Sequence, residues 1–295
     1  MSHGPRDAAG HDAVVVRVAG PTATVAVDGE ECEARLTPKV PGGPAVAGDR
    51  VELVDGGEEP LVTGVAPRRT VLRRGDGNDR RPRAIVANAD TVLVVAAVRD
   101  PPIRPPLIDR YLVAAEDGGM EAGLLLTKAD VPHDEAEIAE LAARYRDIGY
   151  PVLLGSAKDP AYVERVRDLI AGRVAVLAGH SGVGKSTLTR GLTGVERAVG
   201  AVSDKARTGR HTTSDPRLIP LPGGGAVVDT AGVRTFHLPR MERADLEAGF
   251  PEIARAAQGC RFRGCAHDGD AGCAVEGAVH PERLESYRRM LADMR

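Results

Sequence analysis

Short apolar runs separated by turn residues fill the chain from residue 13 to residue 65, and no helical periodicity is present there. The runs are rich in valine, and pairs such as Gly20-Pro21, Asp28-Gly29 and Gly56-Gly57 separate them. This pattern predicts a small all-β barrel of the OB type over residues 12–66. The segment contains no Phe, Tyr or Trp that could stack on bases. Contacts to nucleic-acid backbone, contacts to protein and a purely structural role therefore all remain open.

Arginines dominate the next stretch, residues 67–84, which we interpret as a linker. Glutamates are concentrated in the preceding barrel segment, so the net charge of −3 hides a strong asymmetry along the chain. The positive charge of the linker, together with its place between two domains, favours a contact with nucleic acid. Judged by composition alone, the segment also fits a solvated linker without a partner.

Strands and helices alternate from residue 90 onward. Apolar runs predict strands over residues 91–98, 123–126 and 152–154, and a helical pattern follows each of them. Such an alternation is typical of a parallel sheet covered by helices on both faces. The sequence therefore predicts a central α/β domain over residues 85–237 and a small helical C-terminal domain over residues 238–295.

A phosphate-binding motif follows the next apolar run, residues 174–178. It reads Gly-x-x-x-x-Gly-Lys-Ser and leads into a helical segment, which is the arrangement of a P-loop. We expect the Lys185 ammonium to reach the β- and γ-phosphates of a nucleotide and the Ser186 hydroxyl to ligate Mg²⁺. A chance glycine-rich turn is the alternative, but strand, complete motif and helix occur together here. The expected nucleotide-binding residues are Gly179, Ser181, Gly182, Val183, Gly184, Lys185, Ser186 and Thr187.

A second motif, Thr127-Lys128-Ala129-Asp130, comes directly after a predicted strand and precedes the P-loop in the chain. The Asp130 carboxylate can accept hydrogen bonds from guanine N1 and the 2-amino group, and adenine offers no such pair of donors. Ser156-Ala157 fits the accessory loop that approaches guanine O6. Taken alone, Lys-Ala-Asp is a surface helix cap, but beside a P-loop it predicts guanine recognition.

The segment after the P-loop contains candidates for the magnesium shell and for contact with the γ-phosphate. Asp229 ends an apolar run, where its carboxylate can hold Mg²⁺ through water, and the Gly232 N–H can contact the γ-phosphate. Thr213 or Thr212, in a polar loop, can complete the Mg²⁺ shell. A simple polar turn is the alternative for this loop.

Three cysteines and a histidine lie close together near the C-terminus, at Cys260, Cys265, His267 and Cys273. Three thiolates and one imidazole at this spacing suit a tetrahedral structural Zn²⁺, and buried cysteines beside an incidental histidine are the alternative. No apolar run is long enough to span a membrane, and residues 1–11 lack the apolar core of a signal peptide. We therefore expect a disordered leader over residues 1–11, a cytoplasmic protein and a monomer.

Together, these motifs in this order resemble the RsgA family, the circularly permuted GTPases that depend on the small ribosomal subunit. The resemblance extends over nearly the whole chain beyond the leader. It implies GTP or GDP with Mg²⁺, one structural Zn²⁺, and binding to the 30S subunit near the decoding region of 16S rRNA, late in maturation of the subunit. It also implies that the subunit stimulates GTP hydrolysis, and that His211 is the catalytic residue, because Val233 stands where many GTPases have a water-orienting Gln. Thr127 departs from the pattern, since most members carry Asn there.

Two other functions compete with this interpretation. One is an RNA-binding assembly scaffold whose nucleotide site is occupied but barely hydrolyses. The other is an ATP-dependent kinase that uses the same P-loop. Phosphate release with and without 30S subunits distinguishes the first from a GTPase, and competition between guanine and adenine nucleotides distinguishes the second.

Overall fold

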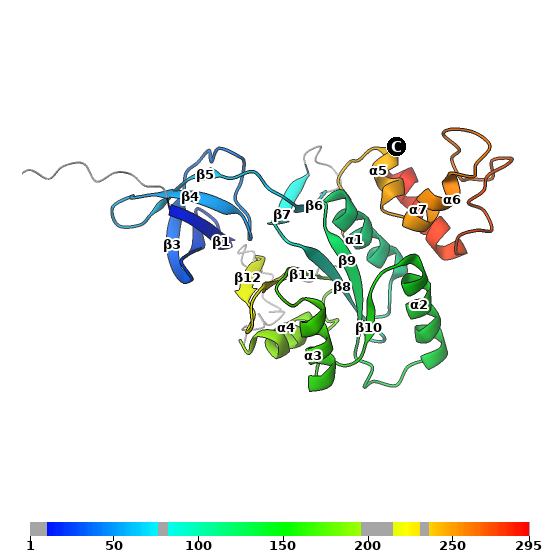
Figure 1. Ribbon diagram of the computed structural model, residues 1–295, viewed down its shortest axis with the longest axis horizontal. Coiled ribbons are helices and arrows are strands. Elements are labelled where there is room, and N and C mark those ends of the chain that lie inside the picture. Colours follow the sequence, from blue (N-terminus) through cyan, green and yellow to red (C-terminus); the bar gives the residue numbers. More distant parts are fainter. Residues whose placement is uncertain (1–10, 76–81, 196–214, 231–235, 295) are drawn as a thin grey trace, which may run out of the picture.

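The computed structural model describes residues 11–75, 82–195, 215–230 and 236–294. Figure 1 shows three parts along the longest axis: a small barrel at one end, a helix-covered sheet in the middle and a cluster of short helices at the other end. The multidomain architecture predicted from the sequence is confirmed. No helix in the described part of the chain combines the length and the apolar character needed to cross a bilayer.

The N-terminal part is a closed five-stranded barrel with strand order β1-β2-β3-β5-β4. Alternate residues along each strand face its interior, which is filled by small side chains such as Val15, Val25 and Val51. Parallel pairing of β3 with β5 completes the ring of otherwise antiparallel pairs. The strands are β1 (His11–Ala19), β2 (Thr22–Val27), β3 (Glu30–Leu36), β4 (Arg50–Val54) and β5 (Leu61–Val65).

The arginine-rich segment after the barrel is more ordered than the linker that we expected. It contains an antiparallel pair, β6 (Val71–Arg74) and β7 (Arg83–Ala87), whose connecting tip lies outside the described residues. The Ala87 N–H donates to the Ala47 carbonyl at 2.9 Å on the barrel side, and the Gly75 N–H donates to the His237 carbonyl at 2.9 Å near the end of the α/β domain. This hairpin therefore connects the two domains through backbone hydrogen bonds.

The middle part is a six-stranded sheet in the order β10-β9-β8-β11-β13-β12, parallel except for β12 at one edge. Successive residues of β8 enter different cores: Val92 and Val94 pack with α1 and α2, while Leu93 and Val95 pack with α3 and α4. Because both faces are covered, the strands are continuously apolar. The strands are β8 (Thr91–Ala97), β9 (Glu121–Thr127), β10 (Val152–Leu154), β11 (Val174–Ala178), β12 (Arg217–Pro220) and β13 (Ala226–Asp229). The helices are α1 (Pro105–Asp117), α2 (Glu135–Ile148), α3 (Pro160–Leu169) and α4 (Lys185–Thr193).

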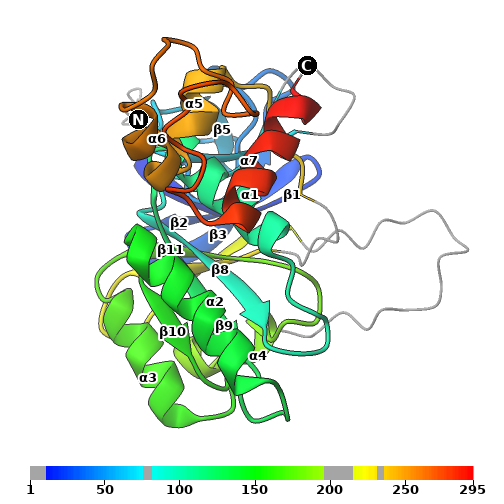
Figure 2. The ribbon, with the colours of Figure 1, turned by 90° about the vertical axis from the view of Figure 1, so that its right-hand side faces the viewer.

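The C-terminal part consists of α5 (Arg243–Ala248), α6 (Pro251–Ala257) and α7 (Pro281–Asp293). Helices α5 and α7 pack against α1, and α6 packs against α5 (Figure 2). The Arg283 guanidinium of α7 is almost fully buried and pairs with Asp109 of α1 at 2.5 Å and with Glu252 of α6 at 2.7 Å. The hydroxyl of Tyr145, on α2, also donates to Asp109 at 2.7 Å. One buried ionic network thus joins the C-terminal helices to the central domain.

Candidate nucleotide and metal sites

The P-loop connects the carboxyl end of β11 to the N-terminus of α4, as the sequence predicted. Gly179, Gly182 and Gly184 all have positive φ angles, of 145°, 82° and 98°. At Gly179 even a Cβ would collide with the backbone carbonyl of Val95 on the neighbouring strand β8. Only glycine permits this combination of backbone angle and close approach, so the loop has the geometry that a phosphate cradle requires.

Lys185 points back into the P-loop. Its side chain is buried, and the ammonium donates to the carbonyl oxygens of Gly179 at 2.9 Å and of His180 at 2.8 Å. Burial lowers the pKa of Lys185 to about 8, although the nearby Asp229 carboxylate acts in the opposite direction. An ammonium held in this way is placed to exchange its carbonyl partners for phosphate oxygens.

The loop after β9, which carries Thr127, Lys128 and Asp130, lies directly against the P-loop. The buried Thr127 hydroxyl donates to the Val183 carbonyl at 2.5 Å and contacts the Ala96 carbonyl at 3.3 Å. We expected Thr127 to contact guanine, whereas the structure directs its hydroxyl to backbone oxygens. The contact to Val183 joins the expected guanine-binding loop to the phosphate-binding loop.

Asp130 is exposed at the mouth of this region, and its carboxylate accepts from the Lys158 ammonium at 2.9 Å. Hydrogen bonds from Ser156 and Lys158 hold the pKa of Asp130 below its usual value, so the side chain stays an acceptor. A backbone bond from the Ala129 N–H to the Gly155 carbonyl, at 3.0 Å, holds the two loops together. Ser156 and Ala157 thus lie beside Asp130, as the guanine-recognition hypothesis requires.

Lys128 has a left-handed backbone conformation and donates its ammonium to the Asp100 carbonyl. Ser186 and Thr187 lie in the first turn of α4 and are half-buried, and Ser181 is exposed. Asp229 is buried at the end of β13, in register with Leu177 of β11. Those expected nucleotide and Mg²⁺ residues that the structure describes therefore lie at the carboxyl ends of four parallel strands, β9, β10, β11 and β13.

Three further expected residues lie outside the described part of the chain. These are His211, proposed as catalytic, Thr213, proposed for Mg²⁺, and Gly232, proposed for the γ-phosphate.

One contact at the P-loop had no signal in the sequence. The Tyr111 hydroxyl of α1 lies near the Gly179 backbone, and burial raises the pKa of this tyrosine. The Tyr111 ring also stacks on Phe236, with centroids 4.2 Å apart. Tyr111 thus links the start of the P-loop to the segment that follows β13.

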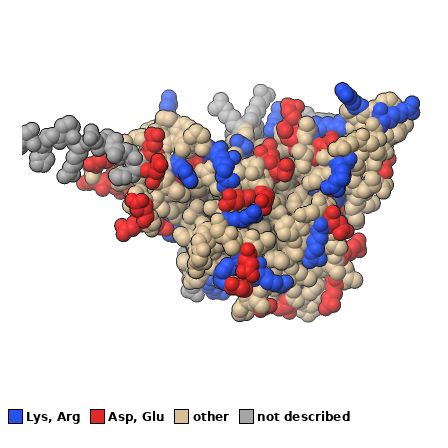
Figure 3. All heavy atoms as spheres, in the orientation of Figure 1, with Lys and Arg blue, Asp and Glu red and all other residues tan. Residues whose placement is uncertain are grey.

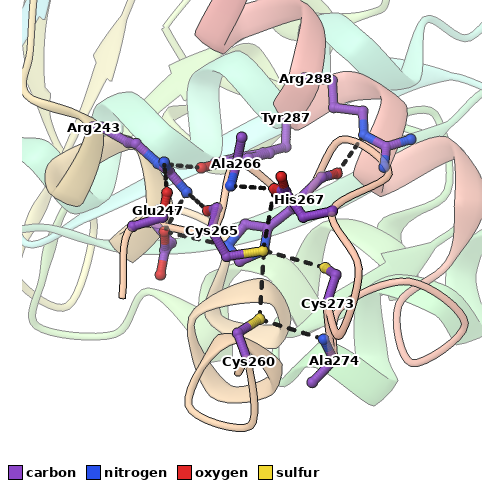
Figure 4. A network of polar contacts seen from close by, with 12 residues as sticks. Arg243, Glu247, Cys260, Cys265, Ala266, His267, Cys273, Ala274, Tyr287 and Arg288 are labelled. Carbon is purple, nitrogen blue, oxygen red and sulfur yellow. Dashed lines mark hydrogen bonds and ion pairs between the residues drawn. The ribbon is translucent and has the colours of Figure 1, made fainter. Parts of the chain in front are cut away.

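The cysteine and histidine cluster is assembled in the C-terminal domain (Figure 4). The ligand atoms of Cys260, Cys265, His267 and Cys273 all lie within 4.8 Å of one another. The His267 Nδ1 atom lies 3.7 Å from the Cys260 sulfur and 3.5 Å from the Cys273 sulfur. A zinc tetrahedron with Zn–S and Zn–N bonds of about 2.3 and 2.0 Å has edges of roughly 3.5–3.8 Å, so this donor set fits Zn²⁺.

Neighbouring side chains hold the cluster in place. The Glu247 carboxylate lies 3.6 Å from His267 Nε2, which leaves Nδ1 facing the sulfur atoms. The Ala274 N–H donates to the Cys260 sulfur at 3.3 Å, and Arg288 donates to the His267 carbonyl at 2.6 Å. His280, the other nearby histidine, instead accepts from the Glu282 N–H as the cap of α7. These contacts fix the positions of donor atoms that fit a metal ion.

A P-loop that follows its guanine-binding loops in the chain, on a sheet of this order, defines a circularly permuted GTPase. Comparison with known protein families identifies the family. The sequence model of the family described as RsgA GTPase matches residues 65–239. Over 275 residues the chain is 40% identical to the small ribosomal subunit biogenesis GTPase RsgA of Azotobacter vinelandii, covering 90% of this chain and 79% of the relative. The chain belongs to the RsgA GTPase family.

Other comparisons agree with this assignment. The protein of the same name from Pseudomonas aeruginosa is 40% identical over 276 residues, covering 90% of this chain and 80% of the relative. The crystal structure of YjeQ from Thermotoga maritima superposes with a TM-score of 0.73 at 26% identity, covering 97% of this chain and 98% of the other. The structure of YloQ, described as a circularly permuted GTPase, gives a TM-score of 0.72 at 23% identity, with coverage of 99% and 98%. The likeness to YloQ supports the fold.

Proposed function

We propose that this protein binds the small ribosomal subunit and 16S rRNA, and couples hydrolysis of GTP in the P-loop site to a late step in maturation of the subunit. The name of the relatives, small ribosomal subunit biogenesis GTPase, supports the partner and the process. A monomeric protein that acts in the cytoplasm would fit this role. The observation that carries the proposal is the hydrogen bond from Thr127 to Val183, because it joins the guanine-binding and phosphate-binding loops in one site.

In the proposed mechanism, the P-loop binds the phosphates and Lys185 replaces its carbonyl partners with phosphate oxygens. Asp130 accepts hydrogen bonds from guanine, which requires Lys158 to share or release that carboxylate. Ser186, Asp229 and Thr213 would hold Mg²⁺, which offsets phosphate charge when bound. Gly232 would contact the γ-phosphate, and His211 would position the attacking water once the subunit orders its loop.

The Cys260, Cys265, His267 and Cys273 set would hold one Zn²⁺ in a structural role. Three thiolates and an imidazole leave no position for substrate on a tetrahedral ion. The ion would fix the fold of the long loop between α6 and α7.

The test is release of phosphate from GTP by the purified chain, with and without 30S subunits. We expect slow turnover alone and a large stimulation by subunits, with ATP failing to compete. The Asp130→Asn variant should lose affinity for guanine nucleotides and gain affinity for xanthine nucleotides, because an amide can donate to the xanthine 2-oxo group. Subunit binding without stimulated turnover would favour the scaffold, and competition by ATP would favour the kinase.

A separate variant tests whether His211 positions the attacking water. His211→Ala should retain nucleotide and subunit binding and lose most of the stimulated turnover. Stimulated turnover equal to that of the parent chain would refute this assignment.

A further inference from the structure

The aromatic side chains of this protein are few, and one of them is placed unlike the others. The chain has three phenylalanines, five tyrosines and no tryptophan. Seven of the rings are buried or half-buried, whereas Phe262 has 56% of its surface exposed. Phe262 belongs to none of the hydrophobic cores, so its ring contributes little to folding. A ring that packs in no core and faces solvent is free to stack on a flat ligand, and the side chains around it decide which ligand fits.

Phe262 lies between two arginines in the turn formed by residues 261–263, which we name the Arg-Phe-Arg turn. The Arg261 guanidinium lies over the Phe262 ring at 5.4 Å from its centroid. Among the described residues, neither Arg261 nor Arg263 forms an ion pair with a carboxylate. Basic side chains also project from the end of the molecule where this loop lies (Figure 3). The turn is therefore a cationic surface with an aromatic ring at its centre.

Acidic residues in the same domain as the turn are already engaged. Glu247 faces Arg243 and His267, Asp268 faces Arg288, and Asp270 accepts from the Ala266 N–H. Their charge is thus partly balanced locally, while that of the two turn arginines is not. A ligand that fits this surface carries negative charge, which attracts the two arginines, and a flat ring, which can stack on Phe262.

The turn is held at both ends by the cysteine and histidine cluster. Cys260 precedes it, and the Cys265 N–H donates to the Phe262 carbonyl at 3.4 Å. The Arg261 N–H donates to the Gly272 carbonyl at 3.1 Å. Because the turn is fixed in this way, a ligand that stacks on Phe262 meets a surface that is already ordered.

A hollow of about 650 Å³ lies beside the ring. Its lining includes Phe262, Arg263 and four alanines, which are Ala244, Ala248, Ala254 and Ala257. The other charged residues that line it are Arg243 and its ion-pair partner Glu247, and three members of the cysteine and histidine cluster form its inner wall. Small apolar side chains leave room for a planar group next to the ring. Arg263 lines the same hollow, where its guanidinium can contact a phosphate. An unpaired nucleotide offers both groups, whereas paired bases in an RNA duplex are already stacked on one another.

We propose that the Arg-Phe-Arg turn is a binding site for single-stranded RNA, in which an unpaired base stacks on Phe262 and its phosphates contact Arg261 and Arg263. The inference rests on the proposed binding of 16S rRNA and names one place where the RNA would bind. The site is separate from the nucleotide site and depends on no step of GTP hydrolysis. It also provides the exposed ring that the barrel lacks, since residues 12–66 contain no aromatic side chain.

The absence of tryptophan makes a direct test possible. In the zinc-loaded full chain, Phe262→Trp introduces a single tryptophan, and stacking of a base should quench its emission. We expect quenching by single-stranded oligo(U) and oligo(A), and little quenching by a blunt RNA duplex at the same phosphate concentration. Emission that does not change while the chain binds these oligonucleotides would overturn the proposal.

Affinity measurements by fluorescence anisotropy complete the test. Phe262→Ala should weaken binding of single-stranded RNA by about 5- to 150-fold, the range for loss of one base–aromatic stack. Phe262→Tyr should bind like the parent, and Phe262→Leu should bind like the alanine variant, because it keeps apolar bulk without a ring. Arg263→Gln should reduce the slope of log affinity against log salt concentration by about 0.7. Zinc content and unfolding midpoint should match the parent in every variant.

The remaining outcomes are also decisive. Phe262→Ala should leave GTP turnover without subunits unchanged, so failure of the RNA site is distinguishable from failure of the GTPase. If Phe262→Ala weakens binding of whole 30S subunits but not of RNA oligonucleotides, the turn contacts protein and the proposal is wrong. It is equally wrong if single-stranded RNA binds the alanine variant as tightly as the parent chain.

Discussion

Two side chains at the nucleotide site, Lys185 and Thr127, bond to backbone carbonyls of the P-loop. Lys185 donates to Gly179 and His180, and Thr127 donates to Val183. Buried carbonyl oxygens that lose such a donor remain without a partner, and this costs free energy. Thr127 therefore affects nucleotide binding through the P-loop, whereas Lys185 also contacts the phosphates directly in the proposed mechanism. Each effect can be measured.

Nucleotide binding should take up a proton at alkaline pH. The pKa of Lys185 is about 8 in the free site, and phosphate oxygens raise it in the complex. Below the free pKa the ammonium is already charged and affinity is flat. Above it, affinity falls by up to about tenfold per pH unit until the pKa of the complex is reached. Calorimetry in buffers of different ionisation enthalpy should find uptake of about one proton near pH 9 and almost none near pH 7. Equal uptake at both pH values would contradict the role of Lys185.

Thr127→Val should weaken binding of both GTP and GDP by about 3- to 30-fold, because it leaves the Val183 carbonyl without its donor. Thr127→Ser keeps the hydroxyl and is the matched control, with an affinity close to that of the parent. A titration with a fluorescent GDP analogue measures both. Parent-like affinity in the valine variant would show that the link between the two loops does not support the site.

Among the elements, the short paired strands after the barrel differ most from the sequence-based expectation. Residues 67–84 contain few apolar positions, and their polar, arginine-rich pattern predicts no strand. Strands β6 and β7 form because Leu72 and Val86 are buried against the sheet domain and Ala47 pairs with Val86, contacts that join distant parts of the chain. Local periodicity carries no information about such partners. It did identify the barrel strands, whose residues alternate in burial, and the continuously apolar strands of the sheet.

The prediction of the site residues was limited in the same way, because contacts between distant parts of the chain could not be predicted. Spacing was enough to predict the P-loop between β11 and α4 and the cysteine cluster, because these motifs depend on residues close in sequence. Guanine binding by the loops after β9 and β10 stays a prediction. Spacing did not show that the Thr127 hydroxyl faces Val183, nor that Tyr111 lies near Gly179 and stacks on Phe236. Those contacts depend on how β9, α1 and β11 pack, which only the folded chain determines.

The loop between α6 and α7 should need zinc for its fold, since it has few apolar residues and no regular element. Cys265→Ser should reduce the zinc content from about one equivalent to near zero and lower the unfolding midpoint by roughly 5–10 °C. Cys32→Ser, on the exposed side of β3, is the control and should change neither. Elemental analysis and thermal unfolding measure the two effects. Full stability of a zinc-free Cys265→Ser variant would argue against a structural metal.

On the scale of the whole molecule, the two outer domains are attached to the centre in different ways. The C-terminal helices share the buried network of Arg283, Asp109 and Glu252 with α1. The barrel is attached through the hairpin, through the half-buried Arg68 paired with Asp49 at 2.7 Å, and through exposed pairs such as Arg217 with Glu31 at 3.0 Å. Breaking a buried ion pair lowers the free energy of unfolding far more than breaking an exposed one. The attachment of the C-terminal helices should therefore be stronger than that of the barrel.

Arg283→Met should lower the free energy of unfolding by about 3–5 kcal/mol, because it leaves the buried Asp109 carboxylate without its cation. Arg289→Met, on the same helix, removes only an exposed pair with Glu285 and should cost at most about 1 kcal/mol. Urea unfolding of the two variants gives the comparison. Similar losses in both would show that the buried network does not stabilise the attachment.

The backbone bond between Gly75 and His237 has a mechanical consequence. It joins the place where the chain enters the sheet domain to the place where it leaves, so the domain between them is a closed loop. A force that pulls the barrel away from the zinc cluster would load this junction first, and the sheet with its nucleotide would bear tension only after the junction had opened.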